Sequence, residues 1–204
     1  MIFVFTLGFE EKYVLRSLTT KGVTKNDEIW IIIPKPRSDR TDTALSFIKM
    51  SLRKLFDKNV NVFEVPIDDF YLSVKELRDL LDGLLQKGEI MLNISGGMKI
   101  LALALLAAAL TLNKEFKITI LREDMGKIYE LPSIVFRPIS LDNIDIKILR
   151  KLSKAGPISA SKLARELKYS RTTVWRRLER LIVEGLVEKV NGKYKITGLG
   201  ISRI

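Results

Sequence analysis

Cysteine and histidine are both absent from the 204-residue sequence. Their absence excludes disulfides, thiolate nucleophiles, zinc sites of the usual ligand types and Ser-His-Asp triads. Long apolar runs are scarce as well, because the longest, residues 100–112, is well short of the ~20 residues that cross a bilayer. We therefore expect no membrane association, no metal, no cofactor and no imidazole catalysis.

The start of the chain also lacks the marks of an export signal. Met1 leads directly into an apolar, strand-like run. A signal peptide would instead begin with a basic segment and end at small residues that mark a cleavage site. We expect a cytoplasmic protein.

Acidic residues are scarce in the last third of the chain. The net charge is +11, and residues 140–204 carry 15 Lys and Arg against 6 Asp and Glu, a net +9, which leaves +2 for residues 1–139. A small basic module beside a larger near-neutral one is typical of a DNA-binding domain joined to a sensing or catalytic domain. Composition alone leaves a solvated basic face as the alternative.

The larger, N-terminal part alternates strand-like and helix-like segments, which predicts an α/β domain with a Rossmann-like, mostly parallel sheet. Strands are expected at residues 2–7, 28–33, 60–65, 90–94 and 117–121, and helices at 10–20, 41–56, 73–85 and 98–112. A final hairpin is expected to turn at residues 123–126. The helix at 98–112 is apolar nearly all round, so we expect a dimer partner to cover the side that the sheet leaves open.

Candidate ligand-binding residues lie in three loops that follow strands, because ligands of open α/β sheets bind beyond the carboxyl ends of the strands. They are Thr6, Leu7, Gly8 and Phe9 after the first strand, Arg37 and Arg40 after the second, and Ser95, Gly96, Gly97, Met98 and Lys99 after the fourth. Paired glycines let the backbone approach a ligand, while Ser95 and Lys99 add a hydroxyl and an ammonium at a helix start.

This constellation predicts a site for phosphate or a nucleotide edge. Its spacing matches neither the Walker loop nor the dinucleotide-binding fingerprint, so neither ATP hydrolysis nor NAD binding is expected. A tight turn without a ligand is the alternative for the glycines, and a solvated side chain is the alternative for Lys99, Arg37 and Arg40.

The C-terminal part is predicted to be a winged helix-turn-helix. Pro138 indicates an extended connector, so we place the domains at 1–136 and 137–204. A first helix begins at Ser140 or Asp142, a second after Ser159, and a third is capped by Ser170. Two alternating strands around Asn191-Gly192 then predict a hairpin, the wing.

The third helix turns a polar, basic face away from its apolar stripe, and such a face can enter the major groove of DNA. The candidate DNA-binding residues are Ser170, Arg171, Thr172, Thr173, Arg176, Arg177 and Arg180 on this helix and Lys189, Lys193 and Lys195 on the wing. We expect these to contact double-stranded DNA. A winged helix used only for protein contacts is the alternative.

The two motifs together resemble a known family. Thr-Leu-Gly-Phe after the first strand, Asn-Ile-Ser-Gly-Gly-Met-Lys after the fourth and Ser-Arg-Thr-Thr-Val-Trp-Arg-Arg-Leu in the third helix are similar to the archaeal CRISPR-associated transcriptional regulators of the Csa type. These join a CARF domain to a MarR-like DNA-binding domain. The resemblance implies a homodimer that binds a cyclic oligoadenylate, foremost cyclic tetra-adenylate, between its CARF domains and regulates promoters of CRISPR loci.

Two other function classes remain open at this point. Some CARF domains cleave their cyclic ligand, and Thr6, Ser95 and Lys99 could align a ribose 2′-hydroxyl and stabilise the departing phosphate without a metal. The chain would then be a metal-independent ring nuclease. The third class is an architectural protein whose α/β domain only dimerises.

Overall fold

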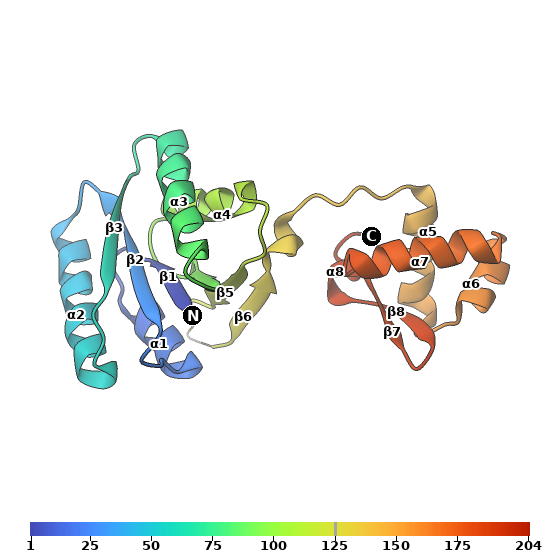
Figure 1. Cartoon of the computed structure of the whole chain (residues 1–204), viewed down its shortest axis with the longest axis horizontal. Coiled ribbons are helices and arrows are strands. Elements are labelled where there is room, and N and C mark those ends of the chain that lie inside the picture. The colour runs from blue at the N-terminus through green and yellow to red at the C-terminus, as the bar shows by residue number, and fades with distance from the viewer. Residues whose placement is uncertain (125) are drawn as a thin grey trace. The chain divides into compact units, whose positions relative to one another are not determined.

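The computed structural model describes residues 1–124 and 126–204. They form two compact units, Met1–Arg137 and Pro138–Ile204, which Figure 1 shows from blue to yellow and from yellow to red. The division falls one residue after the predicted boundary at 136/137. No helix within the described ranges is long and apolar enough to cross a membrane.

The first unit is built on one six-stranded sheet. Its strands are β1 (Ile2–Thr6), β2 (Glu28–Lys35), β3 (Asn61–Pro66), β4 (Ile90–Asn93), β5 (Lys117–Leu121) and β6 (Ile128–Pro132). Their order in the sheet is β3-β2-β1-β4-β5-β6. All neighbouring pairs are parallel except β5 and β6. The predicted Rossmann-like domain with a mostly parallel sheet is confirmed.

Helices cover both faces of this sheet (Figure 1). They are α1 (Lys12–Lys21), α2 (Asp39–Phe56), α3 (Phe70–Leu85) and α4 (Lys99–Thr111). One core packs Phe3, Phe5 and Ile31 against α1 and α2, and the other packs Val4 and Leu92 against α3 and α4. Successive side chains of a strand point to opposite faces, so the two cores alternate along β1.

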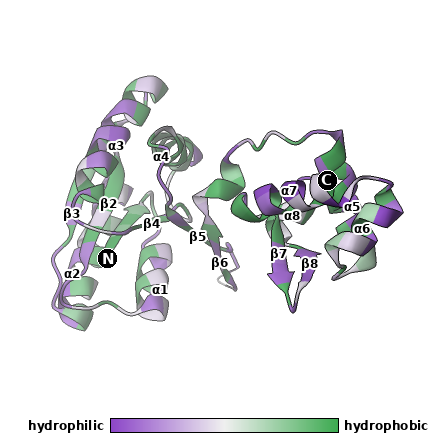
Figure 2. Cartoon of the chain, turned by 45° about the vertical axis from the view of Figure 1, so that its right-hand side comes forward, coloured by the Kyte–Doolittle hydropathy of each residue, from purple (hydrophilic) through white to green (hydrophobic). Residues whose placement is uncertain are grey.

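Helix α4 is the most apolar helix of the unit, as its colour in Figure 2 shows. Leu101 and Leu105 are fully buried, and α3 packs along it. Part of the cover that the sequence assigned to a dimer partner is therefore α3. Leu103 on the outer face remains 57% exposed.

Two details of the first unit differ from the expectation. A short 3₁₀ helix, η1 (Ser133–Phe136), precedes the extended connector that the sequence indicated from Phe136, so the extended backbone begins one residue later, at Arg137. The hairpin between β5 and β6 is present, but its predicted turn includes Met125, which lies outside the described residues.

The second unit contains α5 (Asn143–Ala155), α6 (Ala160–Leu167), α7 (Arg171–Val183), β7 (Val187–Val190), β8 (Lys193–Ile196) and a short α8 (Gly198–Ile201). Asp142, rather than Ser140, caps α5, in a capping box with Asp145. Ser159 and Ser170 cap α6 and α7 as predicted. The β7–β8 turn has positive φ at both Asn191 and Gly192, the backbone that an Asn-Gly hairpin turn requires.

Helix α8 was not anticipated from the sequence. Thr197 caps it by accepting a hydrogen bond from the Gly200 N–H at 3.0 Å. A side chain at Gly200 would lie 2.2 Å from the carbonyl oxygen of Leu186, so only glycine fits there. The tail thus packs onto the base of the wing.

Candidate functional site

The loops after β1 and β4 lie against each other, because β1 and β4 are neighbours in the sheet. A Cβ built on Gly8 would lie 2.9 Å from the Cα of Gly97, and one built on Gly96 would lie 2.9 Å from the carbonyl oxygen of Thr6. Gly97 also has a φ of +88°, where L side chains are strained. The glycines are therefore required by loop packing itself, whether or not a ligand is bound.

Thr6 ties the two loops together. Its hydroxyl donates to the carbonyl oxygen of Gly96 at 2.5 Å, and the carbonyl oxygen of Asn93 lies at 3.4 Å. The side chain is only 1% exposed, and that of Leu7 is fully buried in the core. Both were predicted to bind ligand. Neither side chain reaches the surface: Thr6 positions the loop and Leu7 packs the core, so a ligand contact at these two residues stays a prediction.

A buried amide organises the loop after β4. The Asn93 side chain donates to the hydroxyls of Thr119 at 2.9 Å and Ser17 at 3.2 Å, and its oxygen accepts from the Ser95 N–H at 3.1 Å. Asn93 is 2% exposed. Asn93 belongs to the predicted motif after the fourth strand, but this role was not predicted from the sequence. A single polar residue at the end of an otherwise apolar strand was the available signal.

Ser95 anchors the same loop to β5. Its hydroxyl oxygen accepts a hydrogen bond from the backbone N–H of Leu121 at 2.7 Å. This bond uses only the hydroxyl oxygen, so the contact between Ser95 and a ligand stays a prediction. Thr6 and Ser95 are the hydroxyls required by the ring-nuclease alternative. The Thr6 hydroxyl donates within the loop, whereas the Ser95 hydroxyl accepts there and keeps its own proton.

The start of α4 offers the anion site. Its N-cap, Met98, gives no side-chain cap, and the first turn has no acidic residue. Gly97, Met98 and Lys99 are exposed there. Unpaired N–H groups and the positive end of the helix dipole attract anions, and they disfavour a lysine at that position unless an anion balances it. This part of the predicted site has the geometry to bind phosphate.

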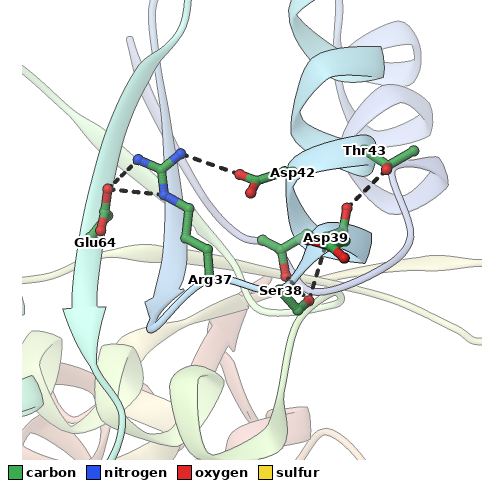
Figure 3. A network of polar contacts seen from close by, with 7 residues as sticks. Arg37, Ser38, Asp39, Asp42, Thr43 and Glu64 are labelled. Atoms are coloured by element: carbon green, nitrogen blue, oxygen red, sulfur yellow. Dashed lines mark hydrogen bonds and ion pairs between the residues drawn. The ribbon is translucent and has the colours of Figure 1, made fainter.

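Arg37 is held by two carboxylates (Figure 3). Its guanidinium pairs with Glu64 on β3 and, at 3.3 Å, with Asp42 on α2. Hydrogen bonding to Glu64 and then Asp42 raises the pKa of Arg37 above its ordinary value. The structure thus gives this predicted ligand contact another role, anchoring the segment between β2 and α2 to β3.

Arg40, by contrast, faces the loop after β1. Its guanidinium lies 4.5 Å from the centroid of the Phe9 ring, a cation–π distance. Phe9 is 45% exposed. Beside this pair is a hollow of about 310 Å³ lined by Phe9, Glu11, Asp39, Arg40, Thr43, Ala44 and Phe47.

A larger hollow of the first unit lies elsewhere. It encloses about 640 Å³ among Glu89, Phe116, Lys117 and their neighbours, at the amino ends of β4 and β5. Ligands of this fold class bind at the opposite, carboxyl ends of the strands. We therefore place the site at the loops after β1, β2 and β4.

In the second unit, α7 divides the predicted DNA-binding residues into two groups. Arg177 pairs with Asp142 at 2.7 Å and Asp145 at 3.5 Å, and Arg180 also pairs with Asp145. The Asp145 side chain is fully buried, so its charge needs these partners. The structure therefore gives Arg177 and Arg180, both predicted to bind DNA, a role inside the domain.

The other group lies at the N-terminal half of α7. Arg171, Thr172 and Arg176 are exposed, whereas the hydroxyls of Ser170 and Thr173 are paired with each other at 2.8 Å. Trp175, which the prediction omitted, is 53% exposed. Arg171 also lines a hollow of about 590 Å³ together with Ser159, Ser161, Lys162, Ala164, Arg165 and Tyr169 of the α6 region. Three cations around one hollow favour a phosphate-rich partner.

The three wing lysines are exposed. Lys195 pairs with Glu188 across the hairpin at 3.2 Å, and the Lys189 ammonium lies 5.7 Å from the centroid of the Tyr194 ring. Exposed pairs of this kind are weak, so both cations stay available to a nucleic acid backbone.

Comparison with known proteins matches residues 1–132 to the family described as Csa3 CRISPR-associated Rossmann-like domain. This chain belongs to that family. Residues 141–182 match the AsnC-type helix-turn-helix domain, where the resemblance had implied a MarR-like one. A Csa3 relative, a CRISPR locus-related protein of Saccharolobus solfataricus, is 22% identical over 204 residues, covering 98% of this chain and 85% of its own length.

Solved structures share the fold. Can2 from Sulfobacillus thermosulfidooxidans, in complex with cyclic tetra-adenylate, has a TM-score of 0.51 at 14% identity over 99% of this Csa3-family chain and 62% of its own. Csm6 from Enterococcus italicus, bound to cyclic hexa-2′-fluoro-hexa-dAMP, has a TM-score of 0.53 at 11% identity. The match covers 90% of this chain and 53% of Csm6. VC1899 from Vibrio cholerae has a TM-score of 0.50 at 13% identity, and the match covers 99% of this chain and 63% of VC1899. The chain therefore spans less than two thirds of each of these proteins.

Proposed function

We propose that this Csa3-family chain is a ligand-responsive transcription regulator of CRISPR loci. Its Rossmann-like domain binds a cyclic oligoadenylate, foremost cyclic tetra-adenylate, and its helix-turn-helix domain binds promoter DNA. The observation that carries the proposal is the exposed, uncapped start of α4 with Lys99 in its first turn, in a chain that also has a net +9 helix-turn-helix unit.

The ligand side rests on charge and symmetry. Lys99 and the neighbouring N–H groups supply positive potential without a balancing acid in that turn. In a homodimer, two such sites about a two-fold axis would match a cyclic ligand that has rotational symmetry of its own. The exposed apolar face of α4, with Leu103, is the surface that we assign to this dimer.

Titration calorimetry tests this part. Cyclic tetra-adenylate is expected to bind with one ring per dimer, and Lys99→Ala is expected to weaken binding at least tenfold, because a charge-assisted phosphate contact contributes about 1.5 to 3 kcal/mol. Lys114→Ala, at an exposed position near the other end of α4, is the matched control. Binding unaffected by Lys99→Ala would contradict the site.

The DNA side rests on the exposed cations of α6, α7 and the wing. A duplex selected by the protein from a random pool is expected to contain repeated or palindromic half-sites, as a dimeric reader requires. Its affinity should then be measured with and without saturating cyclic tetra-adenylate. Equal affinities would contradict the proposed coupling between ligand and DNA binding but would leave the two binding proposals in place. Chromatography of the incubated ligand would reveal cleavage, the activity of the ring-nuclease alternative.

A further inference from the structure

We infer that the hollow beside Phe9 is a nucleobase subsite, which takes a base with an exocyclic amino group from the nucleotide whose phosphate meets the start of α4. The hollow is lined by Phe9, Glu11, Asp39, Arg40, Thr43, Ala44 and Phe47. The inference rests on the proposed function for the source of the base, but the chemistry of the hollow stands on its own.

Its position is the first argument. Phe9 directly follows Gly8, whose backbone touches that of Gly97. Gly97 in turn leads into the exposed start of α4. A phosphate at Lys99 and a base at Phe9 would therefore bind to two loops that are already in contact, at the same edge of the sheet.

The lining is the second argument. Phe9 and Phe47 are each 45% exposed, although both border the same hollow. Exposed aromatic rings beside a cation are the platform on which nucleic acid bases stack, and the Arg40 guanidinium lies over the Phe9 ring at 4.5 Å. The hollow encloses about 310 Å³, which is ample for one base.

The polar groups of the hollow favour a base that donates. Glu11 and Asp39 both line it and supply carboxylate oxygens. An ionised carboxylate accepts hydrogen bonds and donates none, so both side chains suit an exocyclic amino group. The Thr43 hydroxyl donates to the backbone carbonyl oxygen of Asp39 at 2.8 Å, as Figure 3 shows, so its oxygen also remains as an acceptor. Uracil and thymine lack an exocyclic amino group and offer these acceptors only their ring N3–H, so they fit this set less well.

The hollow is held in shape before a ligand arrives. Arg37 pairs with Glu64 and Asp42 and so holds the segment before α2 (Figure 3). Ser38 caps the helix by accepting from the Thr41 N–H at 3.2 Å. Five lining residues, Asp39, Arg40, Thr43, Ala44 and Phe47, are on this helix. Because the start of the helix is fixed, Arg40 stays over Phe9, and binding costs little conformational entropy at these side chains.

Mononucleotides test the subsite independently of any cyclic ligand. In NMR titrations of the full chain, millimolar AMP is expected to shift the amide signals of Phe9, Arg40, Thr43 and Phe47, whereas UMP at the same concentration shifts them far less. Equal shifts with both nucleotides, or none with either, would overturn the inference.

Variants test it against the cyclic ligand. Phe47→Ala is expected to weaken cyclic tetra-adenylate binding about tenfold, the usual effect of losing one stacking partner, while Met50→Ala should leave it unchanged. Met50 is on the same helix and 62% exposed, but it lies outside the hollow, so it is the matched control. Equal affinity of Phe47→Ala and wild type would contradict the subsite.

The two proposals can fail separately. If AMP shifts these signals but the wild-type protein binds no cyclic oligoadenylate, the proposed function falls and the nucleobase subsite stands. If cyclic tetra-adenylate binds through Lys99 but AMP moves no signal at the hollow, the subsite falls and the proposed function stands.

Discussion

The Thr6 hydroxyl donates to the carbonyl oxygen of Gly96 at 2.5 Å. A side chain at the end of β1 therefore holds the backbone of the loop that follows the neighbouring strand, β4. Thr6→Val keeps the shape of the side chain but leaves that carbonyl without its donor. We expect a loss of about 1 to 3 kcal/mol in the free energy of unfolding, measured by urea denaturation. Thr6→Ser, which retains the hydroxyl, should recover most of it; a fully stable Thr6→Val would contradict the role.

Glycines of the two loops should be irreplaceable for steric reasons. Gly97→Ala introduces a Cβ 3.2 Å from that of Thr6, at a φ of +88°, and should destabilise the protein by more than about 1 kcal/mol. Gly83→Ala in α3 is the control, because no atom lies within 4 Å of the added Cβ. Alanine there should stabilise the helix by about 0.5 to 1 kcal/mol. Thermal melts of both variants make the comparison.

Neighbouring arginines of α7 should behave differently. Arg176→Ala removes an exposed cation, so we expect weaker DNA binding, a salt slope reduced by about one and an unchanged melting temperature. Arg177→Ala removes a partner of the buried Asp145 and should lower the melting temperature. Arg150→Ala, an exposed arginine on α5, is the control for charge alone. Identical effects of Arg176→Ala and Arg177→Ala on stability would contradict this division.

Trp175 should contribute to DNA recognition. An indole that is 53% exposed on the N-terminal half of α7 adds little to the core, but it could contact apolar base edges such as the thymine methyl group if this half enters the major groove. Trp175→Ala is expected to reduce specific binding more than non-specific binding, with stability maintained. Fluorescence anisotropy with the selected duplex and a scrambled one measures both.

Acid should destabilise the second unit through Asp142. Hydrogen bonds from the Asp145 N–H and then the Ile144 N–H, with the Arg177 charge, hold the pKa of Asp142 below its ordinary value of 3.8. A carboxyl group whose pKa is lowered by folding stabilises the folded state above its ordinary pKa, and this is lost as the pH falls through the lowered value. Stability should therefore decline below about pH 4.

Asp142→Asn provides the comparison. Asparagine still caps a helix but does not titrate, so the fall in unfolding free energy between pH 5 and pH 2 should be shallower than in the wild type. Denaturant titrations across this range measure it. Parallel curves for the two proteins would show that Asp142 makes no contribution.

Periodic elements of this fold are predictable from the sequence, whereas the shortest ones are not. The order of strands and helices follows from alternation and helical spacing, and the Asn191-Gly192 turn from its two residues. The elements η1 and α8 span four residues each, too few to display a period. The cap of α5 was ambiguous because both Ser140 and Asp142 suit an N-cap, and only the reciprocal contact with Asp145 decides it.

The candidate site is predictable in place but not in the roles of its side chains. The loop positions follow from the order of the sheet, so the sequence places Gly97 and Lys99 at the start of α4, where the structure also has them. The partners of Arg37 and Arg180 were not, because Glu64 and Asp145 are 27 and 35 residues away in the sequence and meet them only after folding. Thr6 and Ser95 look like ligand contacts in the sequence, but a buried backbone also needs such hydroxyls.

Lys99 at the head of α4 has a practical consequence. A cation at the positive end of a helix dipole leaves the ligand-free protein with an unrelieved repulsion, so any small dianion that reaches this turn should raise the melting temperature. Phosphate and sulfate buffers would then mask part of the stabilisation by a true effector. Ligand screens on this protein are best run in a zwitterionic buffer with chloride as the anion.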